Sequence, residues 1–105
     1  MATVRYSRRA EADLLSIGEY TLETWGETQA DRYLGELEAC CDRLALRPAT
    51  GRLSGRLRPD LRRMETEKHV VFYREVSDGI LVSRILHQSM LPERHFLDEE
   101  DGEGG

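Results

Sequence analysis

The chain has 105 residues, with 20 acidic side chains against 15 basic ones and a formal net charge of −5. This length suits a single domain, and no apolar run reaches the roughly 18–20 residues that cross a bilayer. Because the start, MATVRYSRRA, also lacks the apolar segment of a secretory signal, the sequence argues against a membrane or secreted protein and favours a cytoplasmic one.

The first part of the chain predicts a strand followed by a helix. Residues 2–6 alternate as a strand does, and Ser7 can then cap a helix over residues 8–25. Gly26 provides the end of that helix, because glycine readily takes the left-handed conformation. Helical spacing produces two rows of side chains: Ala10, Leu14, Ile17 and Tyr20, and beside them Leu15, Gly18, Leu22 and Trp25.

A second helix is predicted directly after Gly26. Thr28 and Asp31 resemble a capping box, and Pro48 and Gly51 mark its termination. The short connection folds the two helices back as an antiparallel hairpin. The predicted core face of the second helix carries Ala30, Tyr33, Leu34, Leu37, Cys41 and Leu44.

Two adjacent cysteines, Cys40 and Cys41, lie in this second helix. Neighbouring side chains of a helix point in different directions, so we expect both thiols to stay reduced and one to pack in the core. The chain offers no metal-ligand motif, glycine-rich phosphate loop or nucleophile elbow. We therefore predict neither a metal nor a cofactor.

Arginines concentrate in residues 47–63, which hold six of them against one acid, Asp60. Residues 1–46 instead carry five arginines and nine acids, so one surface of the protein is expected to be positive. Arginine suits bidentate contacts to carboxylate or phosphate, although a solvated basic loop is an equally good interpretation. Residues 98–105 hold five acids and no base, which predicts a disordered acidic tail after a single domain over residues 1–97.

The second half predicts three strands, at residues 61–68, 69–76 and 80–86, of which the first has the weakest pattern. Asp78 and Gly79 supply a tight hairpin turn, and Pro92 permits a short helix over residues 92–97. The predicted fold class is α+β. An N-terminal strand leads into an antiparallel two-helix hairpin packed on one face of a C-terminal antiparallel sheet, and a short C-terminal helix follows.

Such a two-layer domain leaves the second face of its sheet free to bind something. That face or its edge is expected to carry whichever polar residues of the strands point away from the helices, out of Arg63, His69, Tyr73, Arg84 and His87. Arg63, Arg84 and His87 are candidate catalytic residues, since arginine can stabilise a phosphate and histidine can move a proton near neutral pH.

From the residues alone, a structural interpretation of the same cluster is favoured. Arg84 would pair with a carboxylate such as Glu65 or Glu75, and His87 would bind a backbone carbonyl where the strand ends. The aromatic residues Tyr20, Trp25 and Tyr33 occur at helical spacing and are expected in the core.

Five segments carry a more specific signal: YSRRAEADLLSIGEYTLETWGETQADRYLGEL at 6–37, RPATGR at 47–52, LRPDLRR at 57–63, HVVFYR at 69–74 and RILHQSMLPERHF at 84–96. In this order the chain closely resembles the ParE toxins of the RelE/ParE superfamily. The resemblance implies a growth-inhibiting toxin made with a ParD-like antitoxin, whose C-terminal segment wraps around it. It further implies inhibition of DNA gyrase, without a cofactor and without direct DNA binding by the toxin.

RelE-type relatives instead cut messenger RNA on the ribosome, with basic side chains on two strands, an arginine after the last strand and a tyrosine in the final helix. The corresponding positions here hold Leu61, Arg63, Val70, Met90 and Phe96, so most of that set is missing. We therefore expect a gyrase poison rather than an enzyme. An mRNA endonuclease, for which His87 is the remaining argument, and a non-toxic antitoxin-binding protein are the alternatives.

An antitoxin must bury apolar surface and meet the arginines. We therefore expect an acidic amphipathic segment to lie along the helix hairpin and to reach Arg62 and Arg63. The residues expected to bind the antitoxin or the target are Leu15, Leu22, Trp25, Arg62, Arg63, Arg84, His87, Met90 and Arg94.

Overall fold

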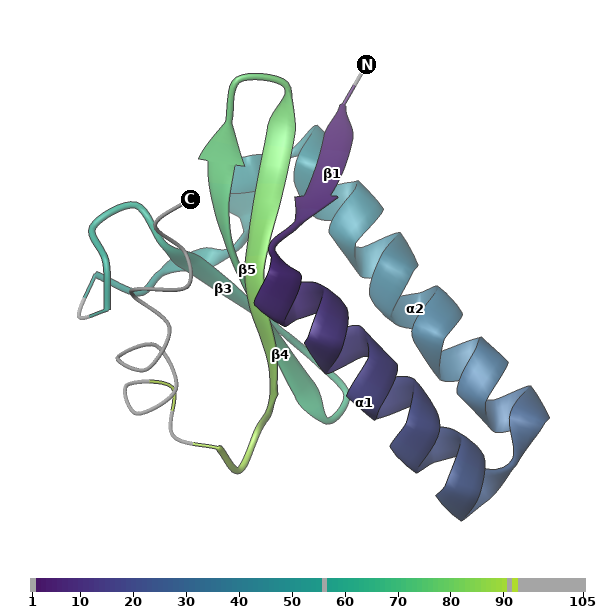
Figure 1. The fold of residues 1–105 in the computed structure, drawn as a ribbon. Helices are drawn as coiled ribbons and strands as arrows, with labels where there is room; N and C mark the ends of the chain where they lie inside the picture. Colours follow the sequence, from purple (N-terminus) through teal and green to yellow (C-terminus); the bar gives the residue numbers. More distant parts are fainter. Residues whose placement is uncertain (1, 56, 91, 93–105) are drawn as a thin grey trace.

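The computed structural model describes residues 2–55, 57–90 and 92 of the chain. The predicted final helix, the domain end at residue 97, the acidic tail and Arg94 lie outside the described residues. No helix of the described part is long and apolar enough to cross a bilayer. The elements are β1 (Thr3–Tyr6), α1 (Arg8–Trp25), α2 (Glu27–Leu46), a 3₁₀ turn (Pro48–Thr50), β2 (Arg52–Leu53), β3 (Arg62–Thr66), β4 (His69–Val76) and β5 (Gly79–His87) (Figure 1).

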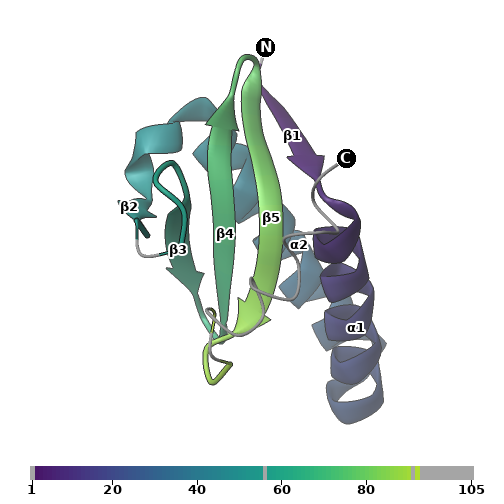
Figure 2. The same cartoon turned by 60° about the vertical axis from the view of Figure 1, so that its left-hand side comes forward.

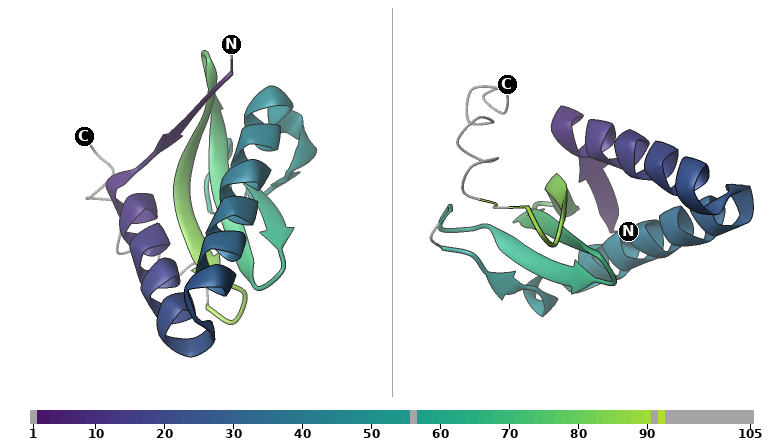
Figure 3. Two further views of the ribbon diagram at one scale, coloured as in Figure 1. Left: turned by 90° about the vertical axis from the view of Figure 1, so that its right-hand side faces the viewer. Right: turned by 90° about the horizontal axis from the view of Figure 1, so that it is seen from below.

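The helix hairpin is confirmed. Ser7 caps α1, its hydroxyl accepting the backbone N–H of Ala10 at 3.0 Å. Gly26 has a φ of 95° and reverses the chain within one residue, so that α2 begins at Glu27. The predicted capping box is therefore wrong, because Thr28 already lies inside α2, which has no side-chain cap. The two helices run side by side in front of the sheet (Figure 3, left).

The sheet has five strands in the order β1-β5-β4-β3-β2, so the predicted antiparallel meander is extended at both edges. β1 pairs with β5 in parallel, from Thr3 opposite Gly79 to Tyr6 opposite Val82. At Gly79 a Cβ atom would come within 1.9 Å of the Thr3 carbonyl oxygen, so glycine is needed for this close approach. The sequence analysis missed β2, because a two-residue strand carries no periodicity.

The main core lies between the helices and the sheet and includes both cysteines, rather than the one expected. Burial raises the pKa of the Cys41 thiol to about 11, so it stays protonated. Tyr73 also points to this side of the sheet. Its hydroxyl donates to the Pro48 carbonyl at 2.7 Å and accepts the Gly51 N–H at 2.7 Å, which ties β4 to the 3₁₀ turn.

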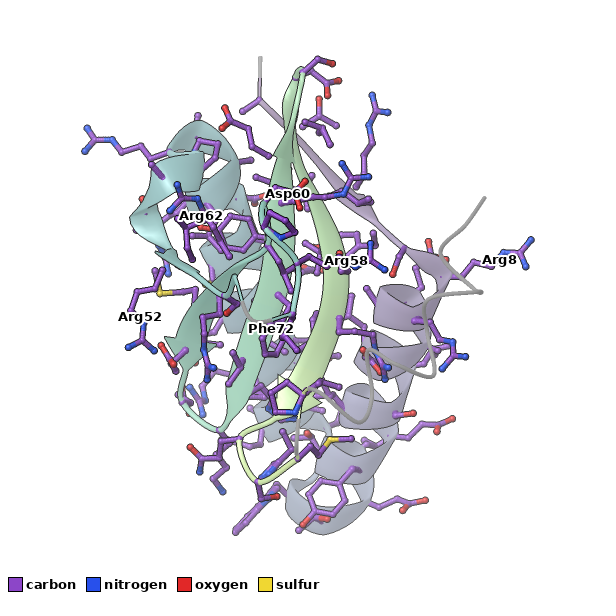
Figure 4. All side chains as sticks on the ribbon, turned by 90° about the vertical axis from the view of Figure 1, so that its left-hand side faces the viewer. Arg8, Arg52, Arg58, Asp60, Arg62 and Phe72 are labelled. Atoms are coloured by element: carbon purple, nitrogen blue, oxygen red, sulfur yellow. The ribbon has the colours of Figure 1, made fainter. Side chains whose placement is uncertain are left out.

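The far face of the sheet is not free, contrary to the prediction. Leu61, Val70, Phe72 and Leu86 form a second, smaller apolar cluster there, with Leu57 and Met90 packed against it. Figure 4 looks onto this face and shows Phe72 on the sheet, with Arg58 and Asp60 of the arginine-rich loop in front of it. This loop therefore supplies part of a core as well as charge.

One ion pair fastens α1 to the edge of β5. β1 stops at Tyr6, and α1 then lies beside the remaining length of β5 (Figure 2). Asp13 of α1 binds the Arg84 guanidinium through both carboxylate oxygens at 2.8 Å and accepts the Ile85 N–H at 2.9 Å. The predicted partners of Arg84, Glu65 and Glu75, are wrong, because α1 replaces β1 as the neighbour of β5 here. The Asp13 carboxylate thus supplies the hydrogen-bond acceptor that a longer β1 would have offered to β5.

Replacing Asp13 by alanine should lower the free energy of unfolding by about 3 kcal/mol, because the buried Arg84 guanidinium would lose its carboxylate and the Ile85 N–H its acceptor. Asp13→Asn keeps an acceptor for the N–H and should cost less. Urea unfolding of the two variants and the parent protein measures both effects. A loss of stability below about 1 kcal/mol for Asp13→Ala would contradict the proposed role of the Asp13–Arg84 ion pair.

Candidate functional site

A cavity of about 500 Å³ opens between the helix hairpin, the turn that joins β3 to β4, and the end of β5. Its wall combines residues from both halves of the chain that the fold brings together. α1 contributes Ser16, Ile17, Tyr20, Thr21 and Trp25; α2 contributes Gln29, Arg32 and Tyr33; and the sheet contributes Glu67, Lys68, His69 and His87.

The aromatic side of the cavity is unusually open to solvent. Tyr33 is buried as expected, but Tyr20 and Trp25 are 65% and 62% exposed, so their predicted place in the core is wrong. The physical reason is that the ends of α1 and α2 at their connection extend past the sheet (Figure 1), and none of the described strands lies beneath them. Large aromatic rings left exposed beside a cavity are typical of a binding surface.

A β-bulge places two histidines on the cavity wall. Near the turn, Tyr73 pairs with Val82, but Phe72 pairs with Arg84, so Ser83 is an extra residue in β5. The shift puts His87 opposite His69, with the ring centroids 5.4 Å apart and the rings nearly perpendicular. Without the bulge, a strand period of two would turn His87 to the far face.

Each histidine has a hydrogen-bond partner at Nδ1. His69 Nδ1 lies 2.6 Å from the Tyr33 hydroxyl. His87 Nδ1 accepts the Ser89 backbone N–H at 3.1 Å and lies 2.8 Å from the Ser89 hydroxyl, so Ser89, and not the backbone carbonyl we predicted, fixes this ring. Because its Nδ1 accepts the Ser89 N–H, the His87 ring carries a hydrogen on Nε2 and can donate it.

Burial, with a smaller contribution from the His87 charge, lowers the pKa of His69 to about 4. His69 is therefore neutral at physiological pH. A neutral imidazole hydrogen-bonded to a tyrosine is well ordered, but it does not release a proton near pH 7. The cavity thus has the composition of a binding site more than that of an acid–base catalyst.

The candidate catalytic residues do not converge on one site. Arg84 is 7% exposed and bound to Asp13. Arg63 lies over the Phe72 ring at 5.5 Å, with its Nε 3.3 Å from a Glu65 carboxylate oxygen. Phe72 is paired with both Arg63 and Arg84 and separates them on the far face, whereas His87 opens into the cavity on the helix side.

The predicted binding residues occupy three separate surfaces. Leu15 and Leu22 are 69% and 50% exposed on one face of α1, and Trp25 belongs to the cavity. Arg62 lies on β3, where its Nη1 donates to the Gly51 carbonyl at 2.7 Å, and Met90 packs against the far-face cluster. Sequence reasoning did not single out Asp13 and Lys68, whose roles depend on tertiary neighbours.

His69 should make the stability of the protein sensitive to acid. Its pKa is about 4 when folded and about 6.5 when unfolded, so between these values the unfolded chain binds the additional proton. The free energy of unfolding should therefore fall by roughly 2 kcal/mol from about pH 6.5 to about pH 4, with the contribution fully present at higher pH. Urea unfolding of His69→Gln should show a flatter profile. Identical slopes for both proteins would contradict this assignment.

The arrangement agrees with three comparisons to known proteins. The model of the family described as "ParE toxin of type II toxin-antitoxin system, parDE" matches residues 4–92. A protein named Toxin ParE1 from Caulobacter vibrioides is 42% identical over 96 residues, which cover 91% of this chain and 99% of the relative. Toxin ParE1 from Mycobacterium tuberculosis is 39% identical over 91 residues, covering 86% and 93%.

A solved structure described as "Chromosomal ParDE TA system from P. aeruginosa" has the same fold, with a TM-score of 0.69 and 22% identity. The match covers 83% of this chain and 96% of that one. The motifs, the fold and the relatives agree with one another. The chain therefore belongs to the ParE family of toxins of type II toxin–antitoxin systems.

Proposed function

We propose that this toxin inhibits DNA gyrase, so that replication and growth stop, and that a ParD-like antitoxin neutralises it. The observation that carries this choice over mRNA cleavage is the closed apolar cluster on the far face of the sheet. Leu61 and Val70 are 1% and 5% exposed there and pack with Phe72 and Leu86. These are two of the positions at which RelE-type ribonucleases would carry basic side chains.

Cleavage of RNA requires cations around the phosphate and a positioned acid and base. On this face the remaining basic position, Arg63, already contacts Glu65 and Phe72, and Met90 packs on the cluster. To form a ribonuclease site here, the apolar cluster would have to open and Arg63 would have to leave Glu65 to contact the phosphate. The gyrase proposal needs neither change, since a poison acts by binding its target.

The neutralising contact is proposed to have an apolar and a cationic part. Leu15 and Leu22 are seven residues apart and so lie on one face of α1, where their exposed side chains can pack against an amphipathic antitoxin helix. Arg62 and Arg63 lie on β3, three places from β1 in the sheet, so the antitoxin has to reach from α1 to β3 to meet both parts. An antitoxin segment that wraps around the toxin can.

Two assays of the purified toxin test the proposed target. We expect loss of supercoiling by DNA gyrase with accumulation of cleaved plasmid, and intact messenger RNA in a ribosome-dependent cleavage assay. Addition of the antitoxin should restore supercoiling. Full gyrase activity combined with cut messages would overturn the proposal, and inactivity in both assays would favour the non-toxic alternative.

Replacing both Leu15 and Leu22 by aspartate should weaken antitoxin binding at least about tenfold, because the apolar anchors of an interface carry much of its affinity. The unfolding midpoint should change little, since both side chains are exposed. Glu19→Gln and Glu23→Gln on the exposed part of the same helix provide a matched control. If calorimetry shows the same antitoxin affinity for the double variant as for the parent, the apolar contact does not involve Leu15 and Leu22.

A further inference from the structure

We propose that the cavity at the end of the helix hairpin binds an aromatic monocarboxylate. Its ring would lie against Trp25 and Tyr20, and its carboxylate would be held by Lys68 and His87. Neither the toxic activity nor the family assigns a small ligand to this place. The inference rests on the shape of the cavity, its exposed aromatic wall and an excess of hydrogen-bond donors at its rim.

The apolar half of the site is already formed. The volume of about 500 Å³ lies within the roughly 300–1,000 Å³ range of small-molecule sites. Ile17 and Tyr33 line its inner wall, while Tyr20 and Trp25 stand exposed at the opening. A planar apolar group placed there would remove both exposed rings from water and gain aromatic contacts.

The rim offers a cation without a carboxylate partner. Lys68 has no ion pair among the described residues, and its ammonium nitrogen lies 5.7 Å from the centre of the Trp25 ring. The two other charged side chains on the rim, Arg32 and Glu67, lie 3.7 Å apart, and Arg32 also binds Glu36 at 2.7 Å. Glu36 and Glu67 therefore share the Arg32 charge, and Lys68 supplies the second positive charge beside them. An anion at this rim would be held by direct contact with the Lys68 ammonium.

His87 supplies a second hydrogen-bond donor next to this cation. Its Nδ1 is engaged by Ser89, which leaves Nε2–H as the donor, with no partner for Nε2 among the described residues. The backbone keeps the two groups together, because Gln88 donates its N–H to the Lys68 carbonyl at 2.9 Å. An ammonium and an imidazole N–H on one rim match the acceptor atoms of a single carboxylate.

The aromatic wall and the donors at the rim can bind one ligand together if its ring replaces the Lys68 ammonium at Trp25. A ring that stacks on Trp25 takes the place of the Lys68 ammonium over the indole. The ammonium then gains a carboxylate carried by the same ligand, which replaces a cation–π contact by a charge-assisted hydrogen bond. A neutral ligand lacks this second step, so the site should prefer the acid to its amide.

Trp25 is the only tryptophan in the chain, so its fluorescence reports directly on this cavity. We expect a saturable change when the full chain is titrated with 3-phenylpropionate, and about tenfold weaker binding of 3-phenylpropionamide. Lys68→Gln and His87→Gln should each reduce this preference. Arg8→Gln is the matched control, since Arg8 is exposed at the opposite end of α1 (Figure 4).

Equal affinities for acid and amide would overturn the proposal, as would a preference that survives in Lys68→Gln or the absence of a saturable signal. If His87→Gln lowers the unfolding midpoint, Lys68→Gln decides, because Lys68 is exposed in a turn and its loss does not disturb the core. These measurements use the toxin alone. Their outcome is therefore independent of whether gyrase is the target.

A final titration of the toxin–antitoxin complex distinguishes the source of the ligand. Probe binding that persists in the complex assigns the site to a free aromatic acid. Binding to the toxin alone that is lost in the complex assigns it to an aromatic and an acidic side chain of the antitoxin. Both outcomes use the same contacts at Trp25, Lys68 and His87.

Discussion

The contact of Asp13 with Arg84 and Ile85 is the constraint on which the arrangement of this molecule depends. β1 is too short to cover the edge of β5, and a side chain of α1 takes over where the strand ends. Because the carboxylate and the guanidinium are both largely buried, moving α1 would separate two opposite charges in a poorly solvated place. The pair therefore fixes the helix against the sheet, and with it α2 and the cavity between them.

A second constraint, the bulge at Ser83, decides what faces that cavity. One additional residue in β5 turns His87 toward the helices and opposite His69. The same shift leaves Leu86 on the far face, where it completes the apolar cluster with Val70 and Phe72. The place of His87 at the cavity and that of Leu86 in the far-face cluster are thus two consequences of one register change. The bulge therefore affects both the binding surface proposed on the helix side and the apolar far face that argues against RNA cleavage.

The charge of the protein also takes its meaning from the fold. Arginines concentrated in residues 47–63 could have formed an open cationic surface, but several of them have partners within the domain. Arg52 and Arg63 share Glu65, and Arg62 binds the Gly51 carbonyl. Lys68 instead has an aromatic ring as its partner, and it stands at the cavity. Which cations face solvent and which are held within the domain is therefore decided by the fold and not by where charge is densest along the chain.

The family, the α+β class and the bounds of α1 and β4 could be read from the sequence alone, because they depend on local periodicity, caps and turns that each segment carries in itself. The partner of Arg84, the exposure of Tyr20 and Trp25, and the place of His69 beside His87 could not. These features depend on where β1 ends, on how far the helices extend past the sheet and on a one-residue bulge. Each is decided by packing between distant segments, because a strand's pattern does not show which neighbour will satisfy its edge.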